Sequence, residues 1–189
     1  MTVFVKWCGS ALWMRPRWTG ALGSTAMTEH PTGAHPSTER VAAALREAGA
    51  GGQVRVLEDS ARTAQEAATA LGVPVGAIVK SLVFTADGVP VLVLASGDHQ
   101  VDPAKLAAAL SAGTVTRANA DTVRAATGYP IGGVAPLAHP QPLRTLVDTH
   151  LAGFDVLWAA AGTPHAVFPT SYDELVRITA GEPADIAAR

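Results

Sequence analysis

The distribution of apolar residues predicts helices and strands in alternation from residue 37 onward. Between residues 37 and 48, Val41, Leu45 and Ala48 fall on one face of a helix. Residues 53–57 alternate between polar and apolar, which is typical of a strand with one buried face. By the same criteria, helices are expected at 63–72, 104–110, 121–127 and 171–180, and strands at 78–84, 89–96, 114–118, 143–147, 156–160 and 166–168.

Residues at the expected element boundaries support this order. Ser37 is a predicted N-cap, Thr63 and Glu66 have the spacing of a capping box, and Asp102-Pro103 supplies a cap followed by an N1 proline. Asp87-Gly88 stands between two strand patterns and predicts a tight hairpin. A hairpin makes neighbouring strands antiparallel. The sequence therefore predicts an α/β (α+β) fold with a mixed, partly antiparallel β-sheet flanked by helices.

The N-terminal part of the chain differs from the rest. Residues 1–26 contain Lys6, Arg15 and Arg17, three of the four tryptophans and no acidic residue. Such a leader is either an organellar presequence or a stretch upstream of a true start at Met27, which we favour. On both interpretations, residues 1–36 are expected to be a poorly ordered leader and residues 37–189 a single domain.

Composition excludes several classes of protein. Apolar residues make up 48% of the 189 positions, which is too many for a disordered chain, and the net charge of −2 excludes a strongly basic nucleic-acid coat. The single cysteine, Cys8, excludes a disulfide framework and a CxxC zinc site. Because His30 and His35 lie in a Pro/Gly-rich segment, a metal site there would be entropically costly, and no metal or cofactor is predicted. No apolar run reaches the roughly 18 residues of a membrane span.

Lys80 is the first residue that points to chemistry. In its predicted strand it shares a face with Ile78, Leu82 and Phe84. One interpretation is a lysine at the end of a sheet with its ammonium in water. The other is an ammonium that binds a phosphate or carboxylate of a ligand.

Two glycine-rich segments are further candidates for a ligand-binding role. Residues 128–136 contain Gly132-Gly133 between two prolines, and such a segment is either an ordinary tight turn or a loop whose backbone N–H groups bind a carbonyl oxygen. The segment Gly162-Thr163-Pro164-His165 follows an apolar strand. It is either a hairpin turn or a second wall of the same pocket. His99, His139 and His150 are expected on loops without a role.

Several short segments, taken in order, resemble a known family. They are Thr63-Ala-Gln-Glu-Ala-Ala, Leu71-Gly72, Ile78-Val-Lys-Ser-Leu, Val101-Asp102, Lys105-Leu106, Thr127-Gly-Tyr, Gly132-Gly-Val-Ala-Pro, Val147-Asp148 and the strand that ends at Gly162. This succession is similar to the YbaK/EbsC family of freestanding aminoacyl-tRNA editing domains, relatives of the editing insertion in bacterial prolyl-tRNA synthetase. The resemblance covers about residues 40 to 188 and implies the compact mixed α/β fold of that family.

The resemblance implies a trans-editing hydrolase. Such an enzyme removes a small wrong amino acid (alanine, cysteine, serine or threonine) from tRNA, usually tRNA for proline, because a synthetase discriminates only about 10- to 200-fold against one methylene group. Hydrolysis is expected to be assisted by the ribose hydroxyl of the tRNA and to need no metal or cofactor. The implied partners are the acceptor end of aminoacyl-tRNA and prolyl-tRNA synthetase, with no membrane partner, and the implied location is the cytoplasm.

The resemblance also implies roles for particular residues. Lys80 is expected to hold the phosphate region of the terminal nucleotide, and the segment Gly132, Gly133 and Val134 to present backbone donors to the ester carbonyl. The substrate-binding residues are expected to be Ser81, Tyr129, Ala135, Pro136, Gly162, Thr163 and His165. Three departures from the family pattern are Ala138, where members often have glycine, Ser81, where the alanine-specific branch typically has asparagine, and the Gly162–His165 segment, which differs from that of the cysteine-specific type.

Two other functions fit the same residues. One is a binding module that recognises the end of tRNA or a synthetase without hydrolysis. The other is a hydrolase of a different small acyl ester. Retention of both Lys80 and the whole glycine-rich loop favours editing over a pure binding module.

Overall fold

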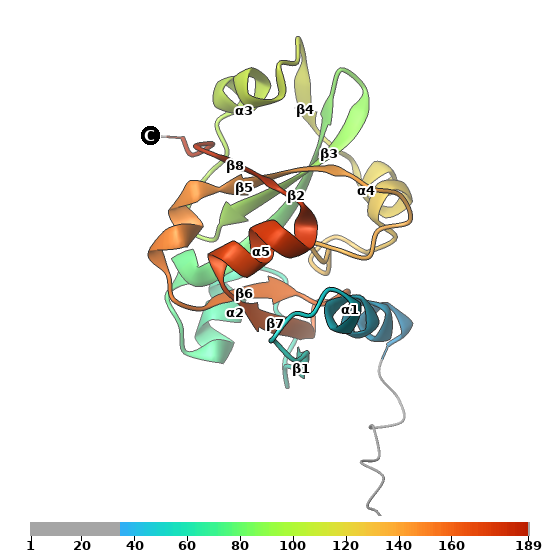
Figure 1. The fold of residues 1–189 in the computed structure, drawn as a ribbon, viewed down its shortest axis with the longest axis vertical. Coiled ribbons are helices and arrows are strands. Elements are labelled where there is room, and N and C mark those ends of the chain that lie inside the picture. Colours follow the sequence, from blue (N-terminus) through green and yellow to red (C-terminus); the bar gives the residue numbers. More distant parts are fainter. Residues whose placement is uncertain (1–34, 189) are drawn as a thin grey trace, which may run out of the picture. The chain divides into compact units, whose positions relative to one another are not determined.

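The structure is a computed structural model that describes residues 35–188. Its centre is an eight-stranded sheet in the order β1-β7-β6-β2-β3-β5-β8, with β4 paired to β2 beside this path (Figure 1). The strands are β1 Arg55–Val56, β2 Ile78–Ala86, β3 Val89–Ser96, β4 Val115–Arg117, β5 Arg144–Asp148, β6 Leu157–Ala160, β7 Ala166–Thr170 and β8 Glu182–Ala184. The helices are α1 Pro36–Glu47, α2 Ala64–Leu71, α3 Pro103–Leu110, α4 Ala120–Thr127 and α5 Tyr172–Thr179, with 3₁₀ turns η1 Val75–Ala77 and η2 Thr149–Gly153.

The sheet is mixed, as the sequence predicts. β2 pairs antiparallel with β3 and β4, and β7 pairs antiparallel with β1 and β6. The β2–β6, β3–β5 and β5–β8 pairs are parallel. The β2–β3 hairpin turns at Asp87 and Gly88, whose φ angles of 48° and 84° are those of the left-handed two-residue turn that suits the twist of antiparallel strands.

Helices cover both faces of the sheet. One face packs on α1, α4 and α5 through a core that includes Val79, Val83 and Phe168. The opposite face packs on α3 through Phe84 and Leu106, and a smaller cluster covers the α2 end. In Figure 1, α5 lies across the near face of the sheet. Consecutive residues of β2 thus point to opposite faces of the sheet, so Lys80 and Ser81 lie on opposite faces.

Local sequence signals explain most element boundaries. The Thr63–Glu66 capping box is complete, and Asp102 caps α3 with Pro103 in the first turn. The predicted Ser37 cap is wrong: His35 caps α1, its Nδ1 accepting from the N–H of Ser37, and Ser37 is buried in the first turn. β1 is shorter than predicted, and β8 lacks the apolar alternation by which the other strands were found.

The leader predicted for residues 1–36 lies outside the described residues, except His35 and Pro36 at the start of α1. Among the helices of residues 35–188, none is long and apolar enough to cross a membrane.

Candidate active site

A gap in the sheet runs along one edge of β2. On that edge β6 pairs only with Ile78 and Val79, and β4 pairs only with Phe84 to Ala86. The carbonyl of Val83 accepts a hydrogen bond from Ala118 at the β4 end of the gap. In a strand the backbone groups of alternate residues point to the same edge, so the N–H and C=O of Ser81 point into this gap.

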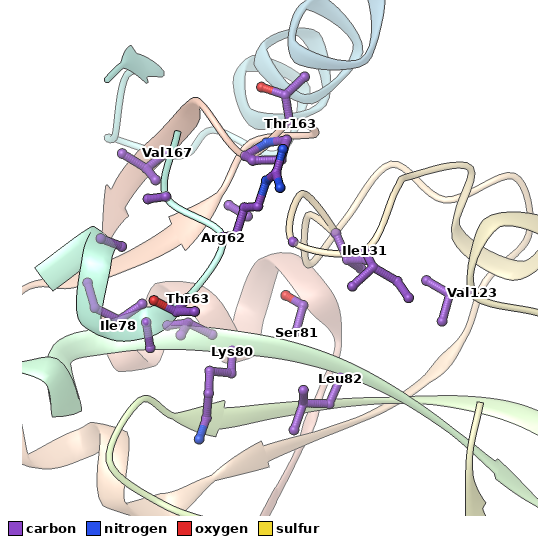
Figure 2. Close-up of a pocket in the computed structure, with 18 of the residues that line it drawn as sticks. Arg62, Thr63, Ile78, Lys80, Ser81, Leu82, Val123, Ile131, Thr163 and Val167 are labelled. Carbon is purple, nitrogen blue, oxygen red and sulfur yellow. The ribbon is translucent and has the colours of Figure 1, made fainter. Parts of the chain in front are cut away.

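The gap opens into a cavity of about 350 Å³ (Figure 2). Its walls come from five parts of the chain: the start of α2 with the residues before it, β2, the end of β4 with α4, the loop after α4, and β6 and β7 with their turn. Aliphatic side chains such as Val79, Val83 and Val134 line much of it. A cavity of this size with apolar walls and a few polar groups has the character of a small-ligand site.

Ser81 supplies an unpartnered polar group in the wall. Its hydroxyl oxygen is buried and has no hydrogen-bond partner among residues 35–188. A buried hydroxyl without a partner costs about 1–3 kcal/mol of stability, so such groups are rare unless a ligand or water satisfies them. Figure 2 shows Ser81 directed to the side of the pocket where Arg62 and Ile131 lie, with Lys80 directed the opposite way.

The loop after α4 offers backbone donors. Gly132 and Val134 line the cavity, and within the described part of the chain their N–H groups donate to no protein acceptor. The N–H of Gly133, in contrast, donates to the carbonyl of Pro130 at 3.0 Å, so this group closes the turn. The predicted donor set is therefore reduced to Gly132 and Val134, with Gly133 as the residue that shapes the loop.

Several side chains hold this loop in place. The hydroxyl of Tyr129 donates to the carbonyls of Leu137 and Ala138, both at 3.1 Å, and Nε2 of His139 donates to the carbonyl of Ala135 at 2.9 Å. Burial raises the pKa of Tyr129 and lowers that of His139. Ala138 has φ of 60°, a left-handed conformation that favours glycine, the residue expected at this position from the family resemblance.

Close backbone contacts fix the distance between the two glycine-rich segments. A Cβ on Gly133 would lie 2.7 Å from Cα and 2.8 Å from the carbonyl carbon of Thr163. Gly162, at φ of 91°, packs in the same way against Ser37 of α1. The loop after α4 and the β6–β7 turn therefore touch directly, as the interpretation of both as walls of one pocket requires.

Three cations and no acidic residue line the pocket. They are Arg62, Lys80 and Arg117. The ammonium of Lys80 donates to the carbonyl of His99, and burial lowers the pKa of Lys80, while Asp98 and Asp148 nearby oppose this shift. Among the described residues the guanidinium groups of Arg62 and Arg117 have no hydrogen-bond or ion-pair partner. Such a lining suits a ligand that carries phosphate groups.

The structure brings together some of the predicted site residues and separates others. Those in the lining are Lys80, Ser81, Gly132, Val134 and Thr163; those outside it are Gly133, Tyr129, Ala135, Pro136, Gly162 and His165. Tyr129 and Ala135 have no exposed surface with which to contact a substrate and act as support for the loop. His165 is exposed, and its carbonyl accepts from the N–H of Leu57 beside β1.

Sequence reasoning missed part of the lining. Arg62 directly precedes the capping box, and its N–H donates to Glu66. Its position at the start of α2 could therefore be predicted from the sequence. Arg117 and Trp158 gave no such signal, because only the pairing of β2 with β4 and β6 brings them to the gap.

Comparisons with known proteins agree with this geometry. The family described as aminoacyl-tRNA editing domain matches residues 58–178, which include every residue of the pocket lining. The chain is 37% identical over 123 residues to the proline–tRNA ligase of Nitratidesulfovibrio vulgaris and 32% identical over 132 residues to that of Geobacter sulfurreducens. These matches cover 65% of this chain but only 20% and 23% of the ligases, so the chain spans about a fifth of their length.

One solved structure is similar to this chain over nearly all of the described residues. It is described as a candidate trans-editing enzyme for prolyl-tRNA synthetase, and it is 40% identical with a TM-score of 0.79, covering 83% of this chain and 100% of that one. The fold and the pocket thus define a protein of the tRNA-editing class. The chain belongs to the aminoacyl-tRNA editing domain family, related to the editing region of proline–tRNA ligases.

Proposed function

We propose that this chain hydrolyses the ester of tRNA that carries a small wrong amino acid, with tRNA for proline as the substrate. The observation that carries the proposal is the gap along β2, where one cavity is lined by free backbone donors, an unpartnered hydroxyl and three cationic residues, with Lys80 directed to the side opposite the hydroxyl. The likeness to a solved structure described as a candidate trans-editing enzyme for prolyl-tRNA synthetase favours action in trans, beside prolyl-tRNA synthetase in the cytoplasm.

The ester carbonyl fits the loop after α4. The N–H groups of Gly132 and Val134 are the donors without protein acceptors, and such groups stabilise the negative charge that develops on a carbonyl oxygen during hydrolysis. The hydroxyl and the carbonyl of Ser81 are the acceptors on the opposite wall, and they suit the α-ammonium group of the amino acid.

The chemical step needs water and the substrate itself. The oxygen of a water molecule attacks the ester carbon, the bond from that carbon to the ribose oxygen breaks, and the departing ribose oxygen takes up the proton that the water gives up. The pocket lining contains no Asp, Glu, His or Cys. The neighbouring ribose hydroxyl of the tRNA is therefore the proposed group that orients the water, and the protein acts by binding and electrostatics.

The apolar wall of the cavity is the part that distinguishes a small amino acid from proline. Val79, Val83, Val123 and Val134 face the cavity beside Ser81, and branched side chains in a close-packed wall yield little. We assign to these four side chains the preference for a small amino acid over proline.

Binding of a hydrolysis-resistant analogue tests where the substrate lies. An aminoacyl-adenosine with an amide in place of the ester is expected to perturb the amide resonances of Ser81, Gly132 and Val134 in NMR spectra of the full chain. Perturbations confined to a surface away from β2 would contradict the proposed site. Binding with no hydrolysis of the corresponding ester would favour a tRNA-end binding module instead.

Ser81→Ala is expected to raise the stability of the protein and to lower its activity. Because its hydroxyl is buried without a partner, its removal should raise the free energy of unfolding by about 1 kcal/mol. Loss of the same hydroxyl as a substrate acceptor should lower kcat/KM for deacylation by about 10-fold. Thr85→Ala on the same strand, where the hydroxyl bonds to Thr116, is the matched control and should leave activity unchanged. Equal activity of Ser81→Ala and the unmodified chain would remove Ser81 from the site.

Arg62→Ala and Arg117→Ala are expected to weaken tRNA binding. Each should raise KM about 3- to 10-fold and reduce the slope of log affinity against log salt by about 0.7, the value for one phosphate contact on a single strand. Arg46→Ala, an exposed arginine of α1 outside the lining, is the control. An unchanged salt slope in both pocket variants would show that these guanidinium groups do not contact phosphate.

A further inference from the structure

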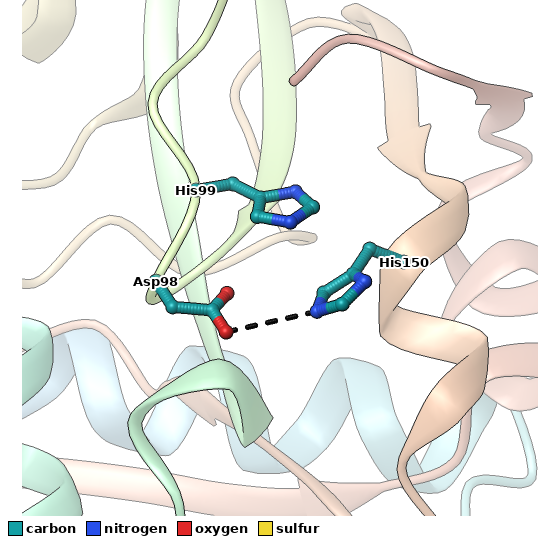
Figure 3. A group of neighbouring side chains, drawn as sticks. All are labelled: Asp98, His99 and His150. Carbon is teal, nitrogen blue, oxygen red and sulfur yellow. Dashed lines mark ion pairs between the residues drawn. The ribbon is translucent and has the colours of Figure 1, made fainter. Parts of the chain in front are cut away.

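A second cluster of ligand-type side chains lies outside the pocket lining. Asp98 and His99 follow the end of β3, and His150 lies in η2 (Figure 3). Their potential ligand atoms all lie within 4.8 Å of one another. The sequence predicted no role for His99 and His150, because 50 residues of chain separate them and only the β3–β5 pairing brings them together.

A buried carboxylate orients the first histidine. Asp148, only 1% exposed, accepts from Nδ1 of His99 at 2.9 Å and from the backbone N–H groups of Ser96 and His150. With Nδ1 donating to this carboxylate, Nε2 of His99 is left as the basic nitrogen. A histidine that donates one ring nitrogen to a carboxylate and presents the other outward is the usual arrangement of a metal-ligating histidine.

The other two groups lie beside it. Oδ1 of Asp98 accepts from the hydroxyl of Ser96 at 2.6 Å, whereas Oδ2 of Asp98 lies 3.6 Å from Nε2 of His150. The His99 and His150 rings are stacked, with centroids 4.0 Å apart and planes inclined by 30°. A metal lies in the plane of each imidazole that binds it, so the exposed His150 ring has to turn out of the stack to complete the site.

We propose that Asp98, His99 and His150 bind a divalent transition-metal ion of the zinc type. Two imidazoles and one carboxylate are ligands that zinc accepts, and a fourth position would be open to water. The two nearby carboxylates outweigh the single ammonium of Lys80, so the cluster favours a cation. Bound metal would tie the loop after β3 to η2, and that loop supplies the His99 carbonyl that holds Lys80.

Calorimetric titration of the full chain with zinc chloride tests this site, with cobalt(II) absorption as a second readout. We expect one ion per chain at this cluster and the visible bands of cobalt in a four-coordinate nitrogen and oxygen environment. His150→Ala and Asp98→Asn should each weaken binding by at least about 10-fold, comparable to the loss of a supporting group around a metal.

The control is His165→Ala, which removes an exposed histidine elsewhere and should leave the affinity unchanged. Circular dichroism spectra that match the unmodified chain would show that the variants fold. Absence of zinc binding by the unmodified chain, or an affinity unchanged in folded His150→Ala, would overturn the proposal. These measurements do not involve tRNA, so their outcome is independent of the proposed editing activity.

Discussion

Gly133→Ala is expected to lower the rate of deacylation by about 100-fold, because it moves the loop that binds the ester carbonyl. The added Cβ would lie 2.7 Å from Cα of Thr163 and 3.0 Å from its nitrogen, and both sides of this contact are backbone. Neither side can turn away as a flexible side chain would. The loop must therefore shift by about 1 Å, and displacements of that size at a reacting centre cost about 100-fold in rate.

A matched variant separates this effect from general damage. Gly153→Ala adds the same atom in η2, where nothing lies within 4 Å, and should leave the rate unchanged. Thermal unfolding followed by circular dichroism shows whether Gly133→Ala remains folded at the assay temperature. A folded Gly133→Ala protein with the rate of the unmodified chain would show that the position of this loop does not matter for hydrolysis.

Lys80→Met is the second large expected effect. Methionine keeps an apolar stem of similar length but removes the ammonium, and hydrogen bonds to charged groups contribute about 1.5–3 kcal/mol. We therefore expect kcat/KM to fall by about 10- to 100-fold. Lys80 lines the pocket on the face opposite Ser81, and its ammonium donates to the His99 carbonyl. The phosphate contact proposed for it therefore lies at the end of the pocket away from the ester.

Lys105→Met provides the control for loss of a positive charge. Lys105 pairs with Asp185 on the surface and is outside the pocket lining, so its removal should change deacylation less than 2-fold, as for most exposed ion pairs. If Lys80→Met and Lys105→Met had the same small effect, Lys80 would not contact the tRNA.

The sequence was most informative where local rules apply. The Thr63–Glu66 box, the Asp102 cap and the Asp87-Gly88 hairpin depend on residues at most three positions apart, and all three are present in the structure. Strand alternation also placed Lys80 on the face of Phe84. His35 replaced Ser37 as the cap because Ser37 packs against Gly162, a contact between distant parts of the chain.

Only part of the site could be predicted from the sequence, because the rest depends on contacts between distant parts of the chain. The glycine-rich loop and Lys80 were recognisable by composition and by resemblance. The sequence could not show that the N–H of Gly133 is already used by Pro130, nor that Tyr129 is fully buried under the loop. Arg117 and the histidine cluster depend on which strands become neighbours, and strand order follows from tertiary packing rather than from local pattern.

The most direct test of the central claim is single-turnover deacylation by the full chain. The substrates are tRNA for proline charged with alanine, cysteine, serine, threonine or proline, each compared with its spontaneous hydrolysis. We predict rapid loss of at least one small amino acid, retention of proline, and slow reaction with Lys80→Met and Gly133→Ala but not with Lys105→Met and Gly153→Ala. No acceleration for any charged tRNA, or full activity in both pocket variants, would contradict editing at the open edge of β2.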